Sequence, residues 1–174
     1  MRNRFDNQLA ELNKELISMG ALCENAIASA VKSLLESNTR LAASAIRIDH
    51  EIDRKEREIE SMCLKLLLQQ QPVASDLRLI SSVLKMITDI ERIGDQASDI
   101  AEIVTCLSGA CGHNKHIDQM AQATIKMVTD SIDSFVRKDY DAAVAVIASD
   151  DVVDTLFQKV KEELTAAIAA QPEN

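Results

Sequence analysis

The chain has 174 residues, of which 47% are hydrophobic but only 2% are aromatic, and it contains four Gly and two Pro. This composition excludes a sheet-rich fold, because an aliphatic core with few turn-forming residues favours long helices. A net charge of −9 excludes nucleic acid as a primary partner, since binding a phosphate backbone needs clustered Lys and Arg. With no apolar signal region and no apolar stretch of roughly 18 residues, we expect a cytoplasmic protein.

Hydrophobic periodicity predicts five helices, which cover about residues 6–37, 40–70, 72–106, 116–137 and 140–170. Pro72 is the sharpest break, and a Gly-bearing loop is expected over about 107–115. Short connections predict antiparallel neighbours, so the expected molecule is an all-α bundle of rods about 45 Å long.

The chain also resembles itself. A shift of 101 residues aligns, without a gap, Ile132 with Val31, Ile147 with Ile46, Asp150 with Asp49 and Asp154 with Asp53. We therefore predict a duplicated three-helix unit. Residues 1–107 form the first repeat, and residues 108–174 form an incomplete second repeat that holds its first two helices and lacks the third, which would be the sixth of the bundle.

Acidic side chains recur at helical spacing. Glu91, Asp95 and Asp99 follow one another at intervals of four, with no i,i+4 base. Each such like-charged pair costs about 0.2–0.5 kcal/mol, so the row is expected either to face solvent or to bind a cation. The other acidic positions are Asp49, Asp53, Glu56 and Glu60 on the second predicted helix, and Asp150 and Asp154 on the fifth.

Two acidic rows on adjacent antiparallel helices can share metal ions, and carboxylate oxygens favour Mg²⁺, Mn²⁺, Ca²⁺ or ferric iron over a lone Zn²⁺. The alternative is a solvated acidic face. Expected i,i+4 pairs of Glu51 with Lys55 and of Asp53 with Arg57 weaken the case for metal on the second helix.

Other sites fit the sequence less well. A di-iron centre needs Glu-x-x-His pairs, and no Glu lies three residues before any of the three His. A soft-metal site around Cys106, Cys111, His113 and His116 matches no strong zinc spacing, so an ordinary loop is expected. His50 is expected on the solvent face, where a bland surface role is favoured over phosphotransfer because no nucleotide-binding Gly loop is present.

Two runs carry a family resemblance: residues 63–79 (CLKLLLQQQPVASDLRL) and residues 84–103 (LKMITDIERIGDQASDIAEI). They closely resemble the PhoU family of bacterial phosphate-signalling regulators. The resemblance implies tandem three-helix bundles with metal-binding E(D)-x-x-x-D motifs, here Asp49/Asp53, Glu91/Asp95, Asp95/Asp99 and Asp150/Asp154, with Glu56 and Glu60 extending the first. It leaves the ion open among Mg, Mn, Fe and Zn. The family's sixth helix, with its second Glu-Arg-Ile-Gly-Asp motif, has no counterpart in this sequence.

By the same resemblance, the chain is expected to be a homodimeric, non-enzymatic adaptor that represses the phosphate-starvation response. It would link the ATPase of a phosphate ABC transporter to a membrane sensor histidine kinase and contact the membrane only through these partners. Two other functions fit the acidic rows: a metal-dependent phosphohydrolase, since bound metals can activate water, and a purely structural helical scaffold.

Overall fold

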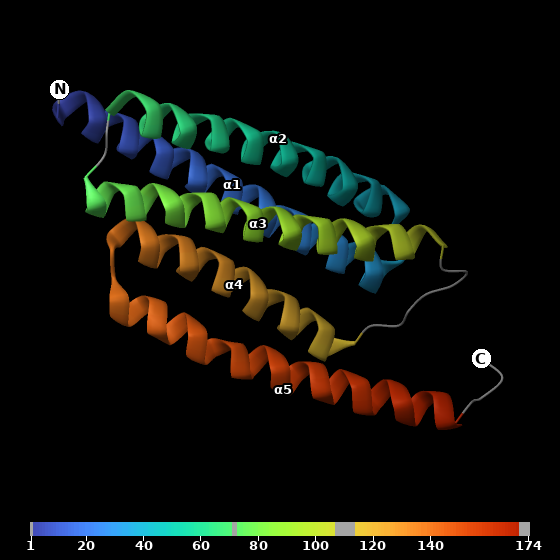
Figure 1. Cartoon of the computed structure of the whole chain (residues 1–174). Helices are drawn as coiled ribbons and strands as arrows, with labels where there is room; N and C mark the ends of the chain where they lie inside the picture. The colour runs from blue at the N-terminus through green and yellow to red at the C-terminus, as the bar shows by residue number, and fades with distance from the viewer. Residues whose placement is uncertain (1, 71–72, 107–113, 171–174) are drawn as a thin grey trace.

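The computed structural model describes residues 2–70, 73–106 and 114–170, with side chains described from residue 5 and not at 69 and 70. These residues form five helices and no strand, as predicted (Figure 1). The helices are α1 (Arg2–Glu36), α2 (Thr39–Gln70), α3 (Ala74–Cys106), α4 (Lys115–Arg137) and α5 (Tyr140–Ala170). Only α1 differs appreciably from its predicted bounds: it begins at Arg2, whereas the predicted start is about residue 6.

The turn between α1 and α2 has a specific geometry. Ser37 adopts a left-handed φ of 52°, the Asn38 N–H donates to the carbonyl of Ser33 at 2.9 Å, and the Asn38 side chain then caps α2. Asn38 therefore bonds to the last turn of α1 through its N–H group and caps the first turn of α2 through its side chain.

The turn between α4 and α5 repeats this geometry. Lys138 has a φ of 56°, the Asp139 N–H donates to the Ser134 carbonyl at 2.9 Å, and the Asp139 carboxylate accepts from the Ala142 N–H. Each of these residues lies 101 positions after its counterpart in the first turn. The local backbone therefore follows the offset found in the sequence.

Helices α1, α2 and α3 pack against one another, α4 packs against α1, and α5 packs against α4 (Figure 1). The first three helices bury one continuous aliphatic core, whose largest side chains include Leu12, Leu16, Met19, Ile52, Ile59 and Ile80. Gly20 lets α4 approach α1, because a Cβ at this position would overlap the Cδ1 atom of Ile132.

Helix α5 is much less covered. It buries only Leu156 and Val160 among its described side chains, and it leaves Tyr140, Ile147 and Ile168 largely exposed. An apolar cavity of about 410 Å³ separates α3 from α4 and α5. Among the described residues, no helix has the length and apolar character that a membrane crossing requires.

Candidate metal centre

The antiparallel packing of α2 on α3 brings their acidic rows together. Asp49 and Asp53 project from α2, Asp95 projects from α3, and one carboxylate oxygen of each lies within 4.8 Å of the others. Asp49 is buried, Asp53 is half-buried and Asp95 is exposed, so the cluster opens to solvent on one side. Three converging carboxylates repel one another unless a cation or protons neutralise them.

Asp49 gives the cluster a buried carboxylate. Its side chain is only 8% exposed, and its Oδ1 atom has no hydrogen-bond partner among the described residues. Burial, followed by the charges of Asp95 and Asp53, raises the pKa of this carboxyl, against a hydrogen bond from the Ser98 hydroxyl that lowers it. A buried carboxylate oxygen without a donor is costly, and a metal ion would satisfy it.

Gly94, which the acidic spacing did not indicate, lets α3 approach α2 closely beside Asp49. An added Cβ would lie 2.9 Å from Cδ1 of Ile52 and 3.1 Å from Oδ1 of Asp49. A glycine in the middle of a helix costs about 1 kcal/mol relative to alanine, so its presence signals a packing constraint. That signal was available in the run Glu91-Arg92-Ile93-Gly94-Asp95.

Glu91 and Glu56 border the cluster. Partial burial raises the pKa of the Glu91 carboxyl, and the charges of Asp95, Glu56, Asp53 and Asp49 add to the effect in that order. Glu56 Oε1 accepts a hydrogen bond of 3.3 Å from the Thr88 hydroxyl across the α2–α3 seam. Glu91 and Glu56 therefore lie beside the cluster without being among its three converging members.

The remaining members of the two rows lie farther away. Asp99 and Glu60 are exposed and do not belong to the convergent set. Four residues of an α-helix turn through about 400°, so each step along an i,i+4 row rotates about 40° around the helix. The row from Glu91 to Asp99 consequently turns away from α2, which is why only Asp95 faces both α2 carboxylates.

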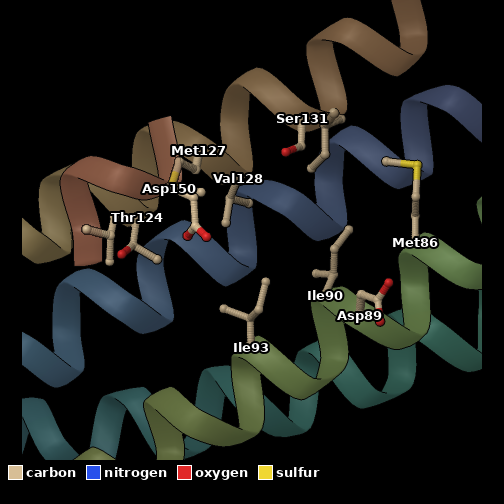
Figure 2. Close-up of a pocket in the computed structure, with 11 residues that line it drawn as sticks. Met86, Asp89, Ile90, Ile93, Thr124, Met127, Val128, Ser131 and Asp150 are labelled. Atoms are coloured by element: carbon tan, nitrogen blue, oxygen red, sulfur yellow. The ribbon is translucent and has the colours of Figure 1, made fainter. Parts of the chain in front are cut away.

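The acidic pair of the second repeat lies apart from this cluster. Asp150 lines the cavity between α3 and α5, where Figure 2 shows it among largely apolar side chains with Asp89 of α3. Asp89 forms an ion pair with Lys85 at 2.8 Å. Asp154 is exposed. Among the residues with described side chains, neither Asp150 nor Asp154 joins a group of three potential metal ligands.

The ion pairs expected on α2 differ from those observed. Lys55 Nζ contacts Glu15 of α1 at 2.8 Å and Glu58 at 2.9 Å, instead of Glu51. The expected pair between Asp53 and Arg57 is also absent from the described ion pairs. Lys55 lies on the α1 side of α2, so Glu15 is within its reach. The prediction of these two pairs was wrong, and Asp53 keeps its charge available to the cluster.

The thiol and imidazole groups of the described residues form no competing group of three metal ligands. Cys106 is exposed, whereas Cys111 and His113 lie outside the described residues. His116 Nδ1 lies 2.9 Å from Glu163 Oε1, and His50 is exposed, as expected.

The all-oxygen donor set of Asp49, Asp53 and Asp95 suits a hard divalent cation, and the unpartnered Asp49 oxygen fits that role.

Comparisons with known proteins agree with the architecture. The model of the PhoU domain matches residues 16–104 and 117–174. A phosphate-specific transport system accessory protein PhoU homolog of Clostridium acetobutylicum is 37% identical over 166 residues, covering 94% of this chain and 76% of that protein. Its counterpart in Pseudomonas aeruginosa is 35% identical over 175 residues, covering 97% and 71%.

Solved structures show the same fold. The crystal structure of PhoU from Pseudomonas aeruginosa has a TM-score of 0.88 and 33% identity, covering 97% of this chain and 82% of that chain. The phosphate transport system regulatory protein PhoU from Streptococcus pneumoniae gives a TM-score of 0.87 and 26% identity, covering 96% and 80%. By its helical fold and by its sequence over nearly its whole length, the chain belongs to the PhoU family.

Proposed function

We propose that the chain is an accessory protein of a phosphate-specific transport system, which represses the phosphate-starvation response when phosphate is plentiful. The names of its relatives support the accessory and regulatory role. In this proposal it links the transporter ATPase to a membrane sensor histidine kinase. Those partners would place it at the cytoplasmic face of the membrane, where it would act as a homodimer.

The observation that carries the structural part of the proposal is the convergence of Asp49, Asp53 and Asp95 around a buried, unpartnered oxygen. A divalent cation held by these carboxylates would neutralise their repulsion and tie α2 to α3. Glu91 and Glu56 border the cluster and would be the next carboxylates available to a second ion. The proposed role of the cation is to hold the α2–α3 surface in one arrangement, without a chemical step.

Complementation of a deletion strain tests the function. Loss of the gene is expected to raise a phosphate-starvation reporter in medium rich in phosphate, and the wild-type gene is expected to restore repression. The Asp95→Asn variant should fail to restore it. Asp151→Asn, at an exposed α5 aspartate whose side chain has no described polar contact, should succeed. An unchanged reporter in the deletion strain would contradict the regulatory role. Full repression by Asp95→Asn would separate that role from the metal site.

A further inference from the structure

Helix α5 presents a face that the other described helices leave largely exposed, at the outer edge of the bundle (Figure 1). At about 100° per residue, one sector of about 100° on this helix holds side chains spaced alternately three and four residues apart. We call them the α5 seam: Ala143, Ile147, Asp150, Asp154, Phe157, Lys161, Leu164 and Ile168. Ile147 is 74% exposed, Phe157 is 52% exposed and Ile168 is 68% exposed. This spacing is typical of coiled coils, so the face is suited to packing against another helix.

The charged side chains of the α5 seam are Asp150, Asp154 and Lys161, and all three are exposed. None of them forms an ion pair with a residue whose side chain is described. The other charged residues of α5 project outside this sector. Among them, Glu163 lies on the flank of α5 that faces α4, where it contacts His116. The α5 seam therefore has apolar ends and a centre of unpaired acidic and basic groups.

The α5 seam is complementary to itself in one antiparallel arrangement. If Ile147 is placed opposite Leu164 of a second copy, the helical spacing fixes every other pair. The facing pairs are then Ala143 with Ile168, Ile147 with Leu164, Asp150 with Lys161, and Asp154 with Phe157. Each pair occurs twice, because such an interface uses the same surface on both copies. Apolar residues thus meet apolar residues, and Asp150 meets a base.

A parallel arrangement of the same two helices lacks this complementarity. It would place Asp150 against Asp150 and Lys161 against Lys161, and like charges that face each other are destabilising. In the antiparallel arrangement Lys161 lies opposite Asp150 of the second copy and one turn away from Asp154 of that copy. The charges therefore favour the antiparallel orientation.

Helix α3 adds apolar surface beside the α5 seam. Asp150 lines the cavity of about 410 Å³ together with Met86 and Ile93 of α3, as Figure 2 shows. Phe157 lines a second apolar cavity, of about 310 Å³, together with Ile93 and Ile100. A helix that packs on the α5 seam would also cover these cavities. Its binding would therefore remove apolar surface of both α5 and α3 from water.

We propose that the α5 seam packs antiparallel against the α5 seam of a second copy of this chain. The interface rests on the homodimer of the proposed function and gives that dimer its contact surface. A second copy supplies both the apolar ends and the opposite charges. A helix that was only apolar would cover Asp150 and Lys161 without pairing them, and burying an unpaired charge is costly.

Sedimentation equilibrium of the whole protein over a range of concentrations measures the dimer. Lys161→Asp should weaken it about 30-fold, because both symmetry-related pairs with Asp150 change from attraction to repulsion. The double variant Asp150→Lys/Lys161→Asp exchanges the two charges and should recover most of the wild-type affinity. Lys159→Asp makes the same change of charge at an exposed α5 position outside the seam and should dimerise as wild type.

A second pair of variants tests the apolar part of the α5 seam. Ile147→Ala should weaken the dimer, because each copy loses its contact with Leu164 of the other. Val144→Ala is the control, since Val144 is 46% exposed but projects outside the seam sector. This control should dimerise as wild type. Circular dichroism of each variant establishes that its helices are intact, so that weaker association reports the surface.

The outcomes separate the interface from the proposed function. A dimer that Lys161→Asp leaves intact would overturn the interface alone, as would failure of the double variant to recover affinity. A chain that stayed monomeric would overturn both the interface and the homodimer, while the reporter assay still decides the regulatory role. If that monomer bound a synthetic peptide of residues 74–106, which form α3, the face would instead take a helix like α3.

Discussion

Asp49 is the one charged side chain that the described helices bury. Because its pKa is raised in the folded state, the folded protein takes up a proton more readily than the unfolded chain. In the absence of divalent cations, the free energy of unfolding should therefore increase as pH falls from neutral toward the ordinary range of aspartate. Glu91, whose pKa is also raised, contributes with the same sign.

Urea unfolding in a chelating buffer at about pH 7.5 and about pH 5.5 measures this dependence. The Asp49→Asn variant removes the titrating group while keeping its shape, so its stability should change less between the two pH values. A variant whose pH dependence equalled that of the wild-type protein would show that Asp49 does not titrate as its burial indicates.

Gly94 gives a second prediction for a single residue. In Gly94→Ala the new methyl group would press on Ile52 and on the Asp49 carboxylate. Overpacking costs about 1–3 kcal/mol, against about 1 kcal/mol gained in helix propensity, so we expect a net loss of about 1 kcal/mol. Metal affinity should fall too, because α2 and α3 move apart. Ser81→Ala, at an exposed α3 position, is the control and should be neutral or stabilising in thermal unfolding.

Among the helices, the start of α4 is fixed to α5 by a small polar cluster. The Asn114 side chain caps α4 by accepting from the N–H groups of His116 and Ile117, while its Nδ2 donates to Glu163 at 3.0 Å. His116 Nδ1 reaches the other oxygen of Glu163 at 2.9 Å. The hydrogen bonds from His116 and Asn114 lower the pKa of the Glu163 carboxyl. Its contribution to stability is therefore present above the ordinary glutamate pKa and is lost as pH falls through the lowered value.

Replacing Glu163 tests this cluster. Glu163→Gln should increase amide hydrogen exchange in the first turn of α4 and in the last turns of α5 at neutral pH, with little change in α2 and α3. Glu162→Gln removes the same charge from an exposed neighbour and should exchange as wild type. Equal protection in both variants would show that the cluster does not hold the two helix ends.

The sequence predicted the helices well and the side-chain partners poorly, for a physical reason. Apolar periodicity reflects the core directly: Val83, Ile90, Ala97 and Val104 follow one another at intervals of seven along α3, and all four are buried. Polar contacts depend on how the helices are placed. Glu163 reaches Asn114, which lies 49 residues earlier in the chain, and no local spacing indicates this contact.

For the whole molecule, the internal repeat bears on which acidic rows can meet. The turns around Ser37 and Lys138 match in geometry at the predicted offset. Among residues with described side chains, however, only the first repeat brings two acidic rows together. Within the part of the chain that the structure describes, Asp150 and Asp154 have no facing acidic row of the kind that α3 supplies to α2. A complete first site beside an incomplete second one stays a prediction from the sequence, whereas the selection of Asp95 over Asp99 follows from the helix crossing.

In the proposed function, Asp49, Asp53 and Asp95 together bind a divalent cation. Isothermal titration of the chelator-treated protein with Mn²⁺ tests it most directly, with Asp99→Asn as the matched control from the same row. The wild-type protein and Asp99→Asn should bind Mn²⁺ alike, while Asp95→Asn should bind at least about tenfold more weakly, because it loses a ligand. Equal binding by Asp95→Asn and the wild-type protein, or an equal loss in Asp99→Asn, would contradict the account.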